Sequence, residues 1–259
     1  MAHEPDFGPL DVTDFTVGAM LRAGIALRRA VRSAETLEDA ADIITRYLYD
    51  HCVTTSGERS CALVRFYKTH RYADLEPGLQ RLAEEQLGGA SAAPDMRCLT
   101  LLGTSGDEPD WNSRHASKGH RTIALPSADS VRAAPMIIRL IEELGVDIES
   151  LISSAEPRVR GSDQRTYDVF HVERALGNPH IPAQREFVER YGIESVVGFG
   201  GLLRSGELFV VILFSRDAIP GRSATRFRTI ALDVRSSLFA FEESQTWREA
   251  GRAQAGRVH

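Results

Sequence analysis

One stretch constrains the fold more than any other: residues 187–215, FVERYGIESVVGFGGLLRSGELFVVILFS. It begins with the end of an amphipathic helix, and Gly192 then supplies the residue without a Cβ that a left-handed helix C-cap prefers. Two apolar runs follow, separated by the polar residues 204–207, a pattern typical of a tight hairpin between two strands. The stretch therefore predicts a helix, turn, strand, hairpin, strand unit.

Helices are expected on both sides of this unit. Apolar residues recur at helical spacing over 17–31 and again over 37–48, where Thr36 and Asp39 form a capping-box pattern. A last amphipathic helix is expected over 223–241. Such wide apolar stripes need a partner surface, so we expect the first and last helices to pack together on one face of a sheet.

The remaining elements alternate in type along the chain. Apolar, β-branched and aromatic runs predict the other strands at 61–67, 96–103, 121–125 and 167–172. A short helix is expected at 77–87 and a helical insertion at about 128–153. We expect residues 1–16 to form an N-terminal tail, 17–242 a single domain and 243–259 a C-terminal tail.

This order of elements resembles the GAF family of small-molecule sensor domains from about Leu21 to Phe241. The local sequences at 169–172, 181–184 and 198–202 are similar to those of a GAF variant found ahead of bacterial histidine kinases. The resemblance implies an α+β fold, with an antiparallel sheet of about six strands. It also implies terminal helices on one face and a ligand-pocket roof on the other.

The chain departs from several GAF subclasses. The Asn-Lys, Phe, Asp-Glu motif of the cyclic-nucleotide domains has no counterpart, and neither Cys52, Cys61 nor Cys98 has the following His of bilin-attaching domains. Free methionine sulfoxide reductases use loop cysteines, whereas Cys61 and Cys98 fall on predicted strands. After Phe241 too little chain remains for an output module, so we expect signalling through a separate protein, such as a histidine kinase, or through the oligomeric state.

Composition narrows the partners and the compartment. The 259 residues are 42% hydrophobic and carry a net charge of −5 with both signs interspersed, which indicates neither a nucleic-acid surface nor an anionic-membrane surface. The three cysteines lack metal or disulfide spacing and are expected as buried free thiols. We find no signal peptide and no apolar run near the roughly 20 residues of a membrane span. A cytoplasmic bacterial protein is expected.

The candidate ligand-binding residues lie on two predicted strands and one loop. A pocket needs apolar walls with few polar anchors, and the alternating residues of strand 167–172 offer that mixture. The face of Asp168, Phe170 and Val172 is the competing one. The expected lining is Tyr167, Val169, His171, Phe199, Trp111 and His115.

Two histidines and one basic run allow both a binding role and a structural role. His171 and His180 flank a loop where an imidazole is able to bind haem or a metal, but ordinary strand and capping roles are favoured, and the cofactor stays unknown. The basic run 68–72, Lys-Thr-His-Arg-Tyr, suits a carboxylate or phosphate, although a solvated loop is favoured. No catalytic residue or metal site is predicted.

We therefore expect a stand-alone sensory or regulatory domain that binds a small, partly apolar ligand. A homodimer through the first helix, around Met20 to Val31, is expected with it. One alternative is an enzyme on the same scaffold, with a redox or small-molecule-modifying activity that uses His171 or a cysteine. The other is a ligand-free dimerisation adaptor.

Overall fold

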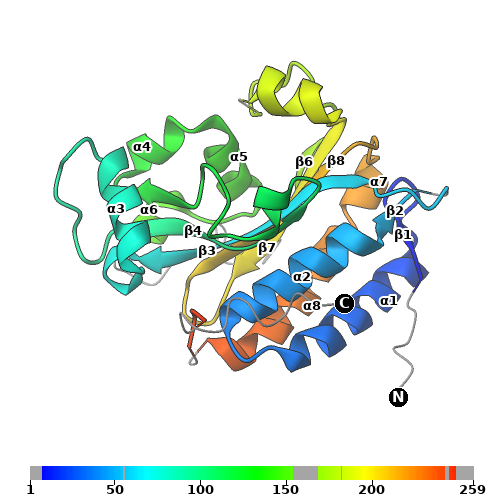
Figure 1. Cartoon of the computed structure of the whole chain (residues 1–259), viewed down its shortest axis with the longest axis horizontal. Helices are drawn as coiled ribbons and strands as arrows, with labels where there is room; N and C mark the ends of the chain where they lie inside the picture. The colour runs from blue at the N-terminus through cyan, green and yellow to red at the C-terminus, as the bar shows by residue number, and fades with distance from the viewer. Residues whose placement is uncertain (1–7, 55, 154–168, 182, 243–244, 249–259) are drawn as a thin grey trace.

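A single six-stranded antiparallel sheet organises the chain (Figure 1). The computed structural model describes residues 8–54, 56–153, 169–181, 183–242 and 245–248. The strands follow the order β5-β4-β3-β8-β7-β6 and confirm the expected α+β sheet. They are β3 (Cys61–Arg71), β4 (Arg97–Gly106), β5 (Thr122–Leu125), β6 (Phe170–Val172), β7 (Ser195–Leu202) and β8 (Leu208–Ser215).

Helices cover both faces of this sheet. Figure 1 shows α1, α2 and α8 on one side and the inserted helices on the other. We call these sides the terminal-helix face and the insertion face. Packing of the first helices with the last one on a single face is confirmed. The helices are α1 (Val17–Ala30), α2 (Leu37–His51), α3 (Pro77–Gln86), α4 (Ala128–Arg132), α5 (Pro135–Glu143), α6 (Ile148–Ile152), α7 (Gly221–Ala224) and α8 (Phe227–Leu238).

The helix starts are set by the capping residues that the sequence indicates. The Thr36 hydroxyl accepts from the Asp39 N–H at 3.1 Å, and the Asp39 carboxylate accepts from the Thr36 N–H at 3.0 Å. This is the expected capping box, which fills two of the backbone donors that a helix start leaves open. It fixes the first residue of α2 and so the stripe that α2 turns toward the sheet.

The helix, turn, strand, hairpin, strand unit is also confirmed. Gly192 has φ +63° after the helical segment Gln184–Glu189, as expected of the left-handed residue that ends it. β7 and β8 then pair antiparallel from Ser195↔Ser215 to Leu202↔Leu208. The turn between them closes where the Leu203 N–H donates to the Glu207 carbonyl at 2.8 Å.

Strand alternation divides the hydrophobic core in two. On the terminal-helix face, Val64, Phe66 and Phe209 join the apolar stripes of α1, α2 and α8. On the insertion face, Leu101 and Phe170 belong to the core that packs under α5 and α6. The central strands are therefore buried on both sides.

The N-terminal segment differs from the expected tail. Leu10, Val12 and Phe15 are buried, and Phe15 packs on Phe227 with ring centroids 4.9 Å apart. The short strand β1 (Leu10–Asp11) pairs parallel with β2 (Cys52–Val53). Three apolar residues in a run of nine are too few to show a period, so their burial was not visible in the sequence.

The cysteines match the expectation of buried free thiols: Cys52, Cys61 and Cys98 are all buried and unbridged. No helix in the described part of the chain has the length and apolar character to cross a membrane.

Candidate functional site

The register of the sheet decides where the predicted pocket residues point. Phe199 is fully buried on the terminal-helix face and stacks on Phe227 of α8, with ring centroids 5.5 Å apart. Val169 belongs to the same core. Its neighbour Phe170 faces the insertion side. Phe199 and Val169 therefore face the terminal helices and not the insertion side, because the direction of a strand residue follows from its pairing partners.

His171 is half-buried on the edge strand β6. Its Nε2 donates to the Ile219 carbonyl at 2.8 Å, and its backbone N–H donates to a Glu143 carboxylate oxygen at 3.1 Å. Both contacts anchor the strand, which agrees with the structural role favoured from the sequence. Tyr167 lies outside the described residues.

Trp111 and His115 come from one loop but lie apart. Trp111 packs on Phe187 and Tyr191, at 5.7 and 4.6 Å between ring centroids. His115 is exposed, with its Nε2 3.7 Å from the Glu38 carboxylate. Among the described residues, none of those predicted to line the pocket lines either of the two cavities described below, and their assignment to ligand binding stays a prediction.

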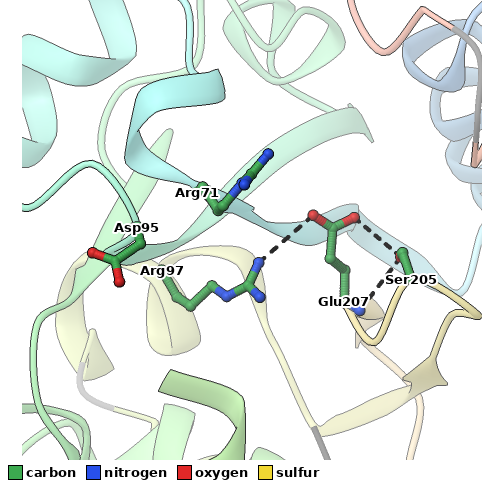
Figure 2. Close-up of a pocket in the computed structure, with 5 residues that line it drawn as sticks. All are labelled: Arg71, Asp95, Arg97, Ser205 and Glu207. Carbon is green, nitrogen blue, oxygen red and sulfur yellow. Dashed lines mark hydrogen bonds and ion pairs between the residues drawn. The ribbon is translucent and has the colours of Figure 1, made fainter. Parts of the chain in front are cut away.

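A polar cavity of about 340 Å³ lies where β3 ends, β4 begins and the β7–β8 hairpin turns. Figure 2 shows its lining, which comes from three segments far apart in the chain. The end of β3 and the start of β4 contribute basic side chains, and the hairpin contributes a hydroxyl and a carboxylate. The lining residues are Arg71, Asp95, Arg97, Ser205 and Glu207.

Lys68 is a buried partner of one of the lining residues, Glu207. It is only 4% exposed, and its ammonium group pairs with the Glu207 carboxylate. Burial lowers the pKa of Lys68, while the Glu207 charge acts in the opposite direction. The solvated loop favoured for residues 68–72 is wrong for residues 68–70, since Lys68 and His70 are buried on β3.

Arg97 reaches the same carboxylate from the other side. Its guanidinium lies 3.8 Å from Glu207, beyond hydrogen-bond distance, and the side chain is 12% exposed. Lys68 and Arg97 therefore share one carboxylate. Figure 2 shows Arg97 extending along the cavity toward Glu207.

An apolar groove of about 340 Å³ adjoins the polar cavity, and Asp95 lines both. Leu125 of β5 is the cross-strand partner of Arg97, so the two hollows meet across the first residue of β4. The groove is lined by Leu87, Ala90, Ser91, Ala93, Asp95, Met96, Leu125, Pro126 and Ile152.

A second buried cation, Arg65, lies on β3 farther inside the sheet. Its terminal nitrogens donate to the Tyr67 and Ser117 hydroxyls, both at 3.1 Å. Its Nε has no partner among the described residues. Neither of the two cavities above is lined by Arg65.

No protein-family model matches the chain, and no curated protein matches it. Among solved structures, the GAF domain of a phosphoenolpyruvate-protein phosphotransferase from Coxiella burnetii is 10% identical, with 85% of this chain and 92% of that chain covered and a TM-score of 0.46.

Two other solved structures show a comparable likeness. Free methionine-R-sulfoxide reductase from Neisseria meningitidis is 8% identical, with 86% and 89% of the two chains covered and a TM-score of 0.46. An N-acylhomoserine lactone-dependent LuxR-family transcription factor from Burkholderia cenocepacia is 14% identical, with 86% and 94% covered and a TM-score of 0.41. Similarity at this level assigns no ligand, activity or partner to this chain.

Proposed function

We propose that this protein is a cytoplasmic sensory or regulatory domain with a GAF-like sheet that binds a small molecule in the adjoining cavities at the sheet end. The observation that carries the proposal is the pairing of a polar cavity with an apolar groove of similar size. Binding sites for small molecules combine apolar walls with a few convergent polar groups.

The signal passes through the dimer state or to a separate protein such as a histidine kinase. Val17, Leu21 and Ile25 form an exposed apolar stripe along α1, and Leu232 is exposed on the neighbouring α8. Residues spaced by four share one side of a helix, so the stripe is continuous. We propose that a second copy of the chain covers this stripe. In such a dimer α1 and α8 form the interface, so a change in how they pack on the sheet would alter the contact between the two copies.

The buried thiols weigh against an enzyme that uses a cysteine. Burial raises the pKa of Cys98 to about 11, and the hydrogen bond between Cys61 and Cys52, together with burial, raises the pKa of Cys61 well above its usual value. A protonated thiol is a poor nucleophile. His171 is likewise occupied by a backbone carbonyl. A sensory role uses none of these groups as a reagent.

Native mass spectrometry of the purified full chain tests the proposal. We expect a mass above that of the polypeptide, which returns to the polypeptide mass under denaturing conditions. Ala93→Trp fills the apolar groove and is expected to abolish the retained mass, whereas Ala116→Trp, at another exposed alanine outside both cavities, is expected to keep it.

A ligand-free adaptor predicts the opposite result. No retained mass, together with no thermal stabilisation by a panel of neutral, anionic and cationic small molecules, would overturn the sensory proposal.

A further inference from the structure

Arg97 is a largely buried cation whose donors are not filled by the protein. A guanidinium carries five N–H donors. The Arg97 side chain forms no hydrogen bond with any described residue, and its one ion pair among them is the 3.8 Å approach to Glu207. None of its nitrogens is among the described buried atoms that lack a partner, so these donors are open to the cavity and able to bind an acceptor there. The cavity beside Arg97 is the place from which such an acceptor would come.

Arg71 adds a second positive charge at the same point. It lies directly opposite Arg97 in the antiparallel pairing of β3 and β4, and both line the cavity. Like charges directly opposite each other destabilise a sheet. The Arg71 Nε donates to Asp74 at 2.9 Å, so Asp74 compensates part of the charge of this exposed side chain. An oxyanion between the two guanidinium groups removes the repulsion.

The nearby carboxylates do not replace such an oxyanion. Glu207 is already paired with the buried Lys68, so its single charge serves two cations. Asp95 lies at the boundary of the two hollows and has an interaction of its own. The positive charge of Arg97 is therefore the one that the protein leaves least compensated in this cavity.

The apolar groove specifies the rest of the ligand. Leu125 lies opposite Arg97 across β4 and β5 and lines the groove together with Met96 and Ile152. Resting on the proposed sensory function, we infer that the ligand is a partly apolar acid: its carboxylate or phosphate binds Arg97 and Arg71, and its aliphatic body lies along Leu125.

Matched six-carbon probes test this inference on the full chain by calorimetric titration. Hexanoate and hexyl phosphate carry the oxyanion, hexanol is neutral and hexylammonium is cationic. We expect both acids, or the better of the two, to bind at least about 10-fold more tightly than hexanol, as charged hydrogen bonds imply. Their ratio distinguishes a carboxylate from a phosphate. Binding of the acids is expected to weaken with salt.

Variants locate the oxyanion. Arg97→Met is expected to weaken acid binding about 10- to 100-fold, the loss expected for charge-assisted hydrogen bonds, and to leave hexanol binding unchanged. Arg71→Met, at an exposed position that does not endanger folding, is expected to act in the same direction. Arg222→Met, at an exposed arginine of α7 outside both cavities, is the matched control.

Two results overturn the inference while the sensory function stands: acids that bind no better than hexanol, or acid binding that survives Arg97→Met and Arg71→Met but is lost in Arg65→Met. In the second case the oxyanion site belongs to Arg65. If no probe binds and native mass spectrometry retains nothing, the sensory function falls as well.

Discussion

The buried carboxylate Glu38 at the start of α2 holds together a charged cluster that the fold depends on. Arg114, which is 3% exposed, pairs with it through Nε at 2.8 Å and Nη2 at 2.9 Å, and the Arg248 backbone N–H donates to it at 3.1 Å. Arg248 belongs to a C-terminal arm, residues 245–248, whose Gln245 and Thr246 carbonyls accept from the first N–H groups of α2 at 3.3 and 3.0 Å. The arm thus satisfies donors that a helix start leaves open.

Glu38→Gln keeps the shape of the side chain and removes its charge. The Arg114 Nη2 bond and the Arg248 N–H bond to this carboxylate each fall from a charged to a neutral hydrogen bond, a loss of roughly 1 to 1.5 kcal/mol apiece. Arg114 keeps its 2.8 Å contact with Glu76, so the full cost of an orphaned buried charge, about 3 to 5 kcal/mol, is not reached. We expect the free energy of unfolding to drop by about 3 kcal/mol, and the melting temperature by roughly 6 to 12 °C.

Guanidinium denaturation followed by circular dichroism measures this loss. Tryptophan fluorescence reports the arm, because Trp247 lies 4.8 Å from the Arg114 guanidinium. Glu85→Gln on the exposed side of α3 is the control, with an expected change within about 0.5 kcal/mol. A loss below about 1 kcal/mol for Glu38→Gln would show that a neutral amide replaces the Glu38 carboxylate almost fully, and would refute the reasoning that its charge stabilises the fold.

Three further outcomes can be checked separately. Light scattering is expected to show a dimer at micromolar concentration and a monomer for Leu21→Arg; a strictly monomeric parent chain counts against the interface at residues 20–31. Burial and the Lys68 charge hold the pKa of His70 well below its usual range. Below about pH 6.5 the unfolded chain therefore takes up a proton that the native chain does not. The free energy of unfolding is expected to fall by about 1.4 kcal/mol as the pH is lowered from about 7.5 to about 5.5. His70→Gln is expected to reduce that slope, and an unchanged slope contradicts the assignment. Gly103→Ala places a Cβ 2.5 Å from the backbone carbonyl of Ala41, so the free energy of unfolding is expected to drop by about 2 kcal/mol or more in a denaturation experiment. An unchanged free energy of unfolding would mean that α2 shifts away from β4 without cost.

The architecture was predictable because each of its elements has a local signature. The apolar stripes of α1 and α2, the Thr36 capping box and the left-handed Gly192 are visible in windows of a few residues. Their packing on one sheet face follows, since an amphipathic helix must bury its stripe. The short strand β1 lacks such a signature, and its burial depends on a partner strand some forty positions away.

The candidate site was less predictable, because strand alternation yields two faces without saying which one is covered by which helices. Placing Phe199 and Val169 requires the sheet order and the position of α8, neither of which a single strand encodes. The polar cavity poses the same difficulty. Arg71, Arg97 and Glu207 become neighbours only through the order β4-β3-β8. The one local sign was the basic run at residues 68–72, for which the sequence favours a solvated loop over an anion site.

The hairpin that borders the polar cavity contacts the residues just after α8, and this contact predicts how binding reaches the dimer. The Ser205 N–H donates to the Glu242 carboxylate at 3.0 Å, and the Arg204 guanidinium lies 4.2 Å from the ring centre of Phe239. A ligand that draws on Arg97 competes for the charge of Glu207 in the same turn. Coupling between two sites requires an element that both of them bias, and this hairpin borders the cavity and contacts the residues that follow α8. We expect Glu242→Ala to leave the affinity for an acidic ligand within about threefold of the parent, below the roughly tenfold that 1.4 kcal/mol represents. The same variant is expected to abolish any ligand-induced change in the dimer dissociation constant, measured by light scattering across a dilution series. If the ligand shifts dimerisation equally in the parent and in Glu242→Ala, the hairpin does not carry the signal.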